Sequence, residues 1–355
     1  MSFEDLEASI EARKKRATTS ARELQIVDED DYHDRWLNAR NLADKDDLHR
    51  LLAVQYEDFR NLLSPKALGQ TSECMVDDLM GLRGAFPNFT HVLEEFEGAA
   101  YRGLRRKYRE LPDLKILLLG PPGIGKTTFV EAVAKVFGQK SHRVSVGGKP
   151  AVFELKGLGR HWQNAAPGAI ARIFAESAVA NPFIILDEID KCRDAFSSFG
   201  RSQDVILELA EPVNARHFRD EYLEIDIDVS NSIIIATAND VSALSEALLS
   251  RFHVIEICSP TPAQNHRVIQ QIYSTLIQDE SDVFEPVLSD MVIGLLELMT
   301  PRVARLKLSR ALGAAAKRSF QIKDDQGKRV KLEISDLQEN GLPKPNRRIG
   351  FVVDP

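Results

Sequence analysis

Eight residues of this chain, from Gly120 to Thr127, have the types and spacing of a loop that binds phosphate. They read GPPGIGKT and fit the pattern G-x-x-x-x-G-K-[ST]. Glycines let backbone N–H groups turn toward an anion, and a following helix adds the positive end of its dipole. The pattern predicts that Lys126 reaches the β- and γ-phosphates of a nucleotide and that the Thr127 hydroxyl ligates Mg²⁺. The predicted nucleotide-binding residues, with Thr128 near the α-phosphate, are Gly120, Pro121, Pro122, Gly123, Ile124, Gly125, Lys126, Thr127 and Thr128.

Two adjacent acids follow an apolar run in PFIILDEIDK, residues 182–191. Acids that end a buried strand lie at the carboxyl edge of a parallel sheet, where α/β proteins bind ligands. We expect Asp187 to hold the Mg²⁺ ion through its water shell and Glu188 to polarise the attacking water. The alternative is that both carboxylates only cap the strand. The phosphate-binding loop earlier in the chain favours the first interpretation.

Three further polar residues stand where they could complete such a site. Asn239 follows the apolar run SIIIATA, and its amide can hold the attacking water between Glu188 and the γ-phosphate. Arg251 precedes the last predicted strand and can neutralise the γ-phosphate of a neighbouring subunit, as an arginine finger does, or can form a surface ion pair. Arg302 begins a C-terminal helix and is expected to contact the nucleotide in its own chain, with Arg305 as the competing candidate.

Strands that alternate with helices are predicted to position these residues. Helical stretches such as Thr127–Phe137 and Gly168–Ala180 lie between apolar strand candidates. This alternation is typical of an α/β fold with a parallel sheet covered on both faces. The predicted strands are Lys115–Leu119, His142–Val146, Phe183–Leu186, Ser232–Thr237 and His253–Ile257.

The chain divides by composition into five predicted parts. The centre, residues 114–258, is the α/β core, and a helical domain that ends in a β-hairpin with its turn at Asp325–Gly327 follows it. The flanking parts are helical at the N-terminus and extended at the C-terminus. In order, the parts are residues 1–64, a charged helical region; 65–113, a helical linker; 114–258; 259–335; and 336–355, an extended tail.

Composition excludes several functional classes. The chain has 355 residues, 43% of them hydrophobic, and a net charge of −7, so an acidic balance gives no general affinity for nucleic acid. No apolar run approaches the roughly 18 residues of a membrane helix, and no export signal is present. Cys74, Cys192 and Cys258 fit no metal or disulfide pattern. We therefore expect a soluble cytoplasmic protein that binds no membrane.

Over residues 114–335 the chain resembles AAA+ ATPases, and more narrowly the ATPase module of Lon protease. Besides GPPGIGKT, the likeness rests on VSVGG, LKGLGRHWQNAAPGAI, NPFIILDEIDK and HFRDEYLEIDIDVSNSIIIATAND. The resemblance implies a P-loop NTPase sheet (the AAA+ core) with a C-terminal helical lid, ATP and Mg²⁺ as cofactors, and a homo-oligomer in the form of a hexameric ring. It also implies that Asn239 is the sensor-1 residue, Arg251 the arginine finger and Arg302 the sensor-2 residue.

Two departures from Lon affect the expected activity. Lon carries a protease domain downstream of its ATPase, whereas only a short tail follows the predicted hairpin here, so we expect no peptidase activity. The long substrate-binding region at the N-terminus of Lon is replaced by a charged helical segment. Its end, LRGAFPNFTHVLEEF, resembles the lead-in of stand-alone bacterial Lon-like ATPases.

One segment bears on how a polypeptide would be gripped. In Lon, the place of GRHWQNAAPG holds an aromatic–aliphatic pair in the central pore; here Trp162 takes the aromatic position and Gln163 and Asn164 follow. An indole can grip an extended chain by apolar contact, and a buried core tryptophan is the alternative. In CRDAFSSFGRSQD, Phe196 and Phe199 are predicted to face the pore or to pack inward.

These features favour an ATP-driven ring that remodels or unfolds proteins, with the N-terminal helices recruiting a protein substrate or adaptor. One alternative is a nucleic-acid motor or clamp-loader-type switch. Its support is the basic runs RKKR at 13–16, RRK at 105–107 and Arg347–Arg348. The acidic net charge makes nucleic acid an unfavoured partner. The other alternative is a scaffold whose assembly ATP controls.

Overall fold

The computed structural model describes residues 21–44, 47–148, 150–162, 164–192, 202–322 and 329–338. Of the positions named above, those outside these ranges are Gln163, Phe196, Phe199, the predicted turn Asp325–Gly327 and the basic runs at 13–16 and 347–348. The described chain forms two compact units: one runs to Pro122 and resumes over Lys126–Cys258, and the other holds Gly123–Gly125 and the chain from Ser259 onward. No helix within the described ranges is long and apolar enough to cross a bilayer.

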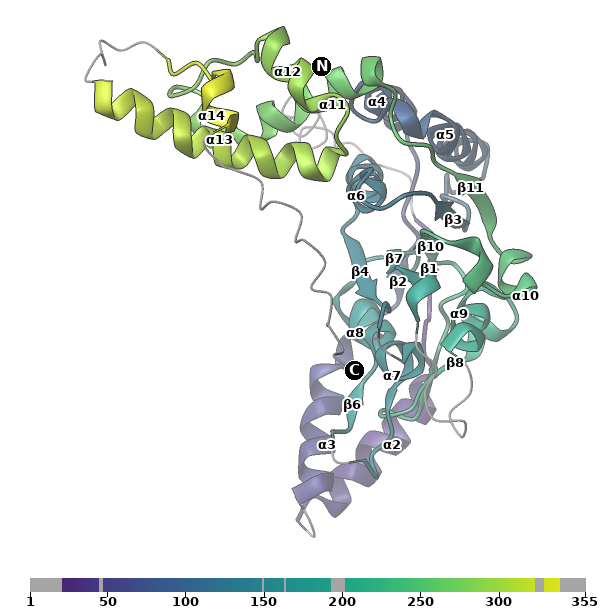
Figure 1. Ribbon diagram of the computed structural model, residues 1–355. Coiled ribbons are helices and arrows are strands. Elements are labelled where there is room, and N and C mark those ends of the chain that lie inside the picture. Colours follow the sequence, from purple (N-terminus) through teal and green to yellow (C-terminus); the bar gives the residue numbers. More distant parts are fainter. Residues whose placement is uncertain are drawn as a thin grey trace, which may run out of the picture. The chain divides into compact units, whose positions relative to one another are not determined.

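The first unit is built on a parallel sheet of five strands (Figure 1). Its order is β11-β3-β10-β7-β4, and every neighbouring pair is parallel. The α/β fold class and the five strands expected for the parallel sheet are confirmed, with bounds that shift by at most one residue. The strands are β3 Lys115–Leu119, β4 Ser141–Ser145, β7 Phe183–Asp187, β10 Ile233–Ala238 and β11 His253–Glu256.

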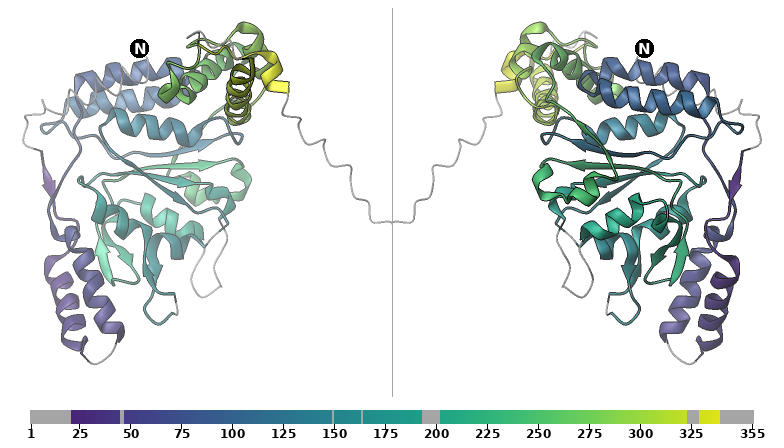
Figure 2. Two further views of the ribbon diagram at one scale, coloured as in Figure 1. Left: turned by 90° about the vertical axis from the view of Figure 1, so that its left-hand side faces the viewer. Right: turned by 90° about the vertical axis from the view of Figure 1, so that its right-hand side faces the viewer.

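Helices cover both faces of this sheet (Figure 2). The central strands β7 and β10 are buried over their whole length, as their unbroken apolar runs require. On one face Phe129 of α6 stacks on Phe89 with ring centroids 4.5 Å apart, and Phe96 stacks on Phe183. The helices on that face are α4 Glu73–Ala85, α5 Thr90–Leu104 and α6 Lys126–Val136; those on the other are α7 Ala151–Lys156 and α8 Ala169–Glu176.

Two short hairpins project from the face covered by α7 and α8. One is the pair β5 Gly157–Leu158 and β6 Ala166–Pro167, which flanks Trp162. The other is the antiparallel pair β8 Phe218–Asp220 and β9 Ile225–Ile227, which follows α9 Ser202–Ala210. Both lie in the first unit, and the contacts between them are described below.

An N-terminal pair of helices, α2 Glu29–Leu42 and α3 Asp47–Asp58, lies side by side in the first unit (Figures 1 and 2). Helix α2 begins at a capping side chain, because Asp28 accepts a hydrogen bond from the backbone N–H of Asp31. The pair packs on the core through buried side chains of Tyr32 and Tyr56. We call it the α2–α3 hairpin.

The second unit is helical, with α11 Pro262–Leu276, α12 Asp290–Leu296, α13 Pro301–Ile322 and α14 Ile334–Gln338 around one apolar core. The predicted C-terminal β-hairpin is wrong. Its first arm, from Ser319, is the end of α13, and α14 begins where the second arm should end. Arg318 holds α14 against α13 through both oxygens of the buried Asp336, at 3.0 and 2.9 Å.

Candidate functional site

The phosphate-binding loop lies between β3 and α6, as its motif requires. The backbone N–H of Gly120 donates to the carbonyl of Ala238 over 3.1 Å, which fixes the start of the loop to the end of β10. Gly123 and Gly125 have φ of 80° and 99°, in the left-handed region where a side chain would be strained. The local backbone therefore turns in the way that a ring of N–H groups around an anion needs.

Lys126 is buried among oxygen acceptors, with only 9% of its surface exposed. Its Nζ donates to the carbonyls of Gly120 and Pro121 and, over 2.9 Å, to Oδ1 of Asn239. Burial lowers the pKa of Lys126, and the negative charge of Asp190 opposes that shift. The structure thus brings together two predicted site residues, Lys126 at the start of α6 and Asn239 directly after β10.

Asp187 ends β7 and gathers three other side chains. Its Oδ1 accepts from the Thr237 hydroxyl over 2.6 Å and lies 3.4 Å from the hydroxyl oxygen of Thr127. Its Oδ2 binds the guanidinium of Arg143, from β4. Thr127 and Asp187 supply hard oxygen atoms beside one another, and Mg²⁺ takes one or two such protein ligands and completes its shell with water and phosphate. The two residues therefore fit a magnesium ion.

No group of three or more His, Cys, Asp or Glu side chains suited to a metal occurs in the described part of the chain. A magnesium ion shared between protein and phosphates needs no such group. Thr127 and Asp187 remain the predicted ligands of such an ion.

Glu188 follows Asp187 in the chain and has an unusual backbone conformation. Its φ is 59°, in the left-handed region, and its N–H donates to the hydroxyl of Thr237 over 3.0 Å. Its carboxylate bonds Lys191, which raises the pKa of that lysine. A Cβ atom on Gly147 would come within 2.9 Å of Oε2 of Glu188. The absence of a side chain at Gly147 therefore leaves room for the Glu188 carboxylate.

Asp190 and Arg143 belong to the site, and the sequence did not single them out. Oδ2 of Asp190 accepts the backbone N–H groups of Asn239 and Asp240 over 3.0 and 3.2 Å, so it anchors the end of β10. Asp190 stands inside the quoted run LDEIDK, and Arg143 stands on a predicted strand. Neither residue type is unusual at its place, so only the fold reveals what each contacts.

The two arginines predicted to contact nucleotide, Arg251 and Arg302, differ in their contacts. The Arg251 side chain is 42% exposed and pairs with Glu211 over 3.2 Å. Arg302 belongs to the second unit, where its backbone N–H donates to the carbonyl of Gly123 over 3.2 Å. Arg305 is exposed on the same helix, α13.

Trp162 lies between β5 and β6 with 43% of its surface exposed, so it is not a buried core residue. The ring of its neighbour His161 lies 5.4 Å from the indole, centroid to centroid. The predicted second pore segment, with Phe196 and Phe199, falls outside the described residues.

Residues 116–259 match the family model described as "ATPase family associated with various cellular activities (AAA)". Among curated proteins, a Lon protease of Campylobacter jejuni is 39% identical over 50% of this chain and 22% of its own length. A Lon protease of Rickettsia bellii is 30% identical over 66% of this chain and 32% of its own length. The chain thus spans less than a third of the length of each of these two relatives.

Among solved structures, a complex of Hsp104 and casein from S. cerevisiae has a TM-score of 0.56 at 16% identity, over 71% of this chain and 49% of that one. At that identity the likeness concerns the fold alone. The family match, in contrast, covers the loop after β3, the acids after β7 and the end of β10 together. Residues 116–259 therefore form an AAA-family domain.

Proposed function

We propose that this chain is an ATP-hydrolysing AAA+ motor that remodels or unfolds protein partners through the pore of a ring, without peptidase activity. The observation that carries the proposal is the set of side chains gathered at the carboxyl ends of β3, β7 and β10. Lys126 contacts Asn239, and Thr127 lies beside Asp187, which Glu188 follows. These are the groups needed to bind a triphosphate with Mg²⁺ and to direct a water at it.

In this proposal each group has a distinct task. The loop N–H groups and Lys126 bind the phosphates, and Thr127 and Asp187 hold Mg²⁺, which when bound neutralises phosphate charge. Glu188 polarises the water, and the amide of Asn239 orients it. The hydroxyl of Thr237 holds both the Asp187 carboxylate and the Glu188 N–H, so the metal ligand and the base are positioned together.

We propose that the site is completed by a second copy of the chain. Arg251 is largely exposed, and its partner Glu211 forms an ion pair at the surface. Such a pair contributes only about 0–1 kcal/mol, so the guanidinium can exchange Glu211 for the triphosphate of a neighbouring subunit at little cost. Arg302 would contact the nucleotide from within the same chain. A hexameric ring is the assembly that we propose on this basis.

Two observations support a protein as the substrate. Trp162 exposes an indole that can grip an extended polypeptide by apolar contact that tolerates many sequences. The curated relatives are named proteases, and their matched segments belong to proteins that act on polypeptides. We propose that Trp162 lines the pore and moves as ATP is hydrolysed, and that the N-terminal helices recruit the substrate or an adaptor.

The variant Glu188→Gln tests the proposal. It should bind ATP like wild type while its turnover falls at least about a hundredfold, because the general base is lost. The matched control is Glu176→Gln, an exposed glutamate paired with Lys140, which should keep normal turnover. With ATP, Glu188→Gln should also hold its protein partners in an assembly that size-exclusion chromatography separates from the monomer.

Three results would contradict the proposal. Normal ATP turnover in Glu188→Gln would show that Glu188 is not the general base. A strictly monomeric protein that hydrolyses ATP at the full rate would show that no site is shared between subunits. Turnover stimulated by DNA, with binding that weakens steeply as salt rises, would favour the nucleic-acid motor instead.

A further inference from the structure

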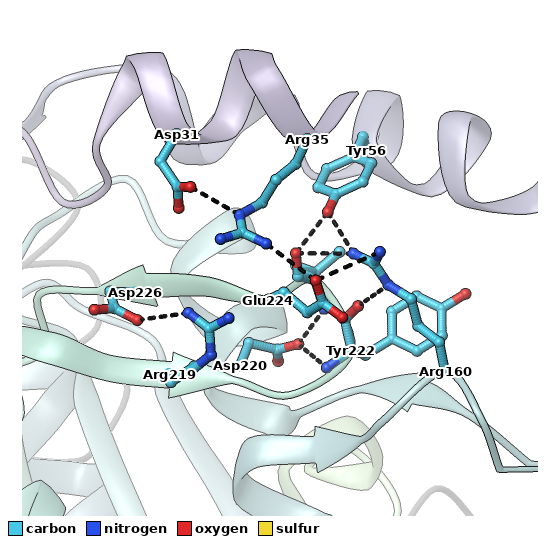
Figure 3. Close-up of polar contacts among 10 residues, drawn as sticks. Asp31, Arg35, Tyr56, Arg160, Arg219, Asp220, Tyr222, Glu224 and Asp226 are labelled. Carbon is cyan, nitrogen blue, oxygen red and sulfur yellow. Dashed lines mark hydrogen bonds and ion pairs between the residues drawn. The ribbon is translucent and has the colours of Figure 1, made fainter. Parts of the chain in front are cut away.

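The turn between β8 and β9, residues 220–224, contacts two parts of the chain that are far apart in sequence (Figure 3). One is made of residues 157–162 and 164–168, which we call the Trp162 loop. The other is the α2–α3 hairpin. Figure 3 shows Arg160 of the loop, Tyr56 of α3 and Arg35 of α2 converging on this turn. We call residues 220–224 the linking turn.

The linking turn holds the Trp162 loop at both of its ends. Near the start of the loop, Arg160 donates to the carbonyls of Tyr222 and Leu223 over 2.7 and 3.1 Å. At its end, the N–H of Gly168 donates to Oδ2 of Asp220 over 2.8 Å. Asp220 is buried and also accepts two N–H groups of its own turn, so it is a fixed anchor. The loop therefore rests on a defined polar base.

The same turn is held from the other side by the α2–α3 hairpin. The hydroxyl of Tyr56 donates to the carbonyl of Leu223 over 2.5 Å, and Arg35 pairs with the Glu224 carboxylate over 3.0 Å. Arg160 also joins the two sides directly, because its guanidinium donates to the Tyr56 hydroxyl over 2.6 Å and lies 3.7 Å from Glu224. The α2–α3 hairpin and the Trp162 loop are thus parts of one network.

Tyr56 is the central member of this network. Only 1% of its surface is exposed, and burial raises its pKa, so its hydroxyl keeps its proton at neutral pH. A neutral hydroxyl donates one hydrogen bond and accepts others. Here it donates to Leu223 and accepts from Arg160. Both capacities are used. The Arg160 guanidinium also lies over the Tyr56 ring, 5.9 Å from its centroid, a contact that does not need the hydroxyl.

Trp162 is well exposed, so burial of the indole does little to fix the tip of its loop. The polar contacts at the base hold the two ends of the loop on which Trp162 stands. These contacts come from the linking turn and, through Tyr56, from α3.

We propose that the α2–α3 hairpin sets the position of the Trp162 loop, with Tyr56 and Arg160 as the positioning residues that connect them. A protein partner that binds the hairpin would then alter the grip of Trp162 on polypeptide without touching the nucleotide site. The inference rests on the proposed function only in the role given to Trp162. The mechanical connection between hairpin and loop stands apart from it.

The first test measures amide hydrogen exchange of residues 157–168 in the full chain without nucleotide. Tyr56→Phe keeps the ring and removes the shared hydroxyl, and Arg160→Gln removes the guanidinium. Each should speed exchange of the loop about fivefold, which corresponds to the loss of a hydrogen bond worth about 1 kcal/mol. Arg160→Lys keeps a cation and should lie between wild type and Arg160→Gln.

Two matched controls should leave loop exchange unchanged. Tyr273→Phe removes the hydroxyl of a buried tyrosine in the second unit, one that donates to the backbone carbonyl of Glu285 over 2.7 Å. Arg219→Gln breaks the ion pair with Asp226 across β8 and β9, beside the linking turn in Figure 3 but outside its contacts with Tyr56 and Arg160.

The second test separates grip from hydrolysis by steady-state ATPase kinetics. In Tyr56→Phe and Arg160→Gln, kcat without polypeptide and the KM for ATP should stay within about twofold of wild type. The concentration of an unfolded polypeptide, reduced and carboxymethylated α-lactalbumin, that half-maximally stimulates hydrolysis should rise at least about fivefold. If Tyr56 and Arg160 only stabilised the fold, kcat, the KM for ATP and the half-maximal polypeptide concentration would all change together.

Each outcome has a definite meaning. Unchanged loop exchange in both Tyr56→Phe and Arg160→Gln overturns the inference, whatever the substrate is. Exchange that also accelerates in α9 and α6 indicates general destabilisation and overturns it too. Faster exchange confined to the loop supports it; if the polypeptide then fails to stimulate even the wild type, the proposed function fails while the positioning role stands.

Discussion

The Nζ atom of Lys126 and the Oδ1 atom of Asn239 lie 2.9 Å apart, which joins the start of α6 to the end of β10. Asn239 is held in that position from behind, because Asp190 accepts its backbone N–H. A residue outside the predicted site thus decides where a predicted site residue lies.

Asp190→Ala tests this arrangement. It leaves the N–H groups of Asn239 and Asp240 without their acceptor, so the free energy of unfolding should fall by about 1–3 kcal/mol. ATP affinity should stay within about threefold, while single-turnover hydrolysis slows at least about tenfold, because Asn239 is no longer fixed. Asp226→Ala, in an exposed ion pair, is the control for both measurements. Wild-type hydrolysis in Asp190→Ala would show that Asn239 needs no anchor.

The ion pair of Arg251 with Glu211 allows a paired experiment on the proposed subunit interface. Arg251→Ala should bind nucleotide normally and lose at least about a hundredfold in turnover, because the neighbouring site lacks its cation. Glu211→Gln frees the guanidinium and should leave turnover equal to or above wild type. Steady-state ATPase rates across a range of protein concentrations provide the measurement. Equal losses in the two variants would mean that the pair matters only for structure.

Gly147→Ala examines the space around the Glu188 carboxylate. The added methyl would stand 2.9 Å from Oε2 and 3.1 Å from Cβ of Glu188, so the carboxylate must move. We expect turnover to fall about tenfold or more with ATP binding preserved, since a small displacement of a base is costly. Gly84→Ala is the control: that helical glycine has open space around it, so alanine should stabilise the fold by about 0.5–1 kcal/mol. Unchanged turnover in Gly147→Ala would show that the position of the Glu188 carboxylate does not matter for ATP hydrolysis.

The lowered pKa of the Lys115 amine should make the free energy of unfolding depend on pH. Burial lowers the pKa of Lys115 from its ordinary value of 10.5 to about 8, and the negative charge of Asp113 opposes the shift. Between these values the unfolded chain binds a proton that the folded chain does not, so the Lys115 contribution to stability rises with pH, by at most about 1.4 kcal/mol per unit. It is present above 10.5 and is lost as pH falls through 8.

The variant Lys115→Met removes the amine that takes up this proton. The difference in unfolding free energy, wild type minus variant, should increase from pH 8 to pH 10 in urea titrations and stay flat from pH 6 to pH 7. A difference that is constant over the whole range would mean that Lys115 titrates alike in both states.

Much of the sheet could be predicted because its signal is local. The strands β7 and β10 are buried on both faces, so their sequences are unbroken apolar runs that no surface element would carry. The loop from Gly120 to Thr127 combines rare residue types at fixed spacing, which chance seldom produces. These patterns predicted the sheet, its carboxyl edge and the residues placed along it.

Other parts depend on contacts that sequence spacing does not reveal. The hairpin predicted after Ser319 is wrong because α13 continues to Ile322, although a Gly-containing turn sequence follows it. Helix α4 lies within the predicted linker and is not distinguished there by its sequence, since its two glycines lower its helical propensity. Arg143 reaches Asp187 only because β4 and β7 are neighbours, although the two strands are far apart along the chain.

Glu188 keeps its side chain on a backbone that favours glycine, since its φ of 59° costs a residue with a Cβ atom about 1 kcal/mol or more. A glycine there would relax the turn and delete the carboxylate in the same step. The proposed chemistry and an unstrained backbone thus make opposite demands on this one position, so the acid is kept at a cost to the free energy of folding.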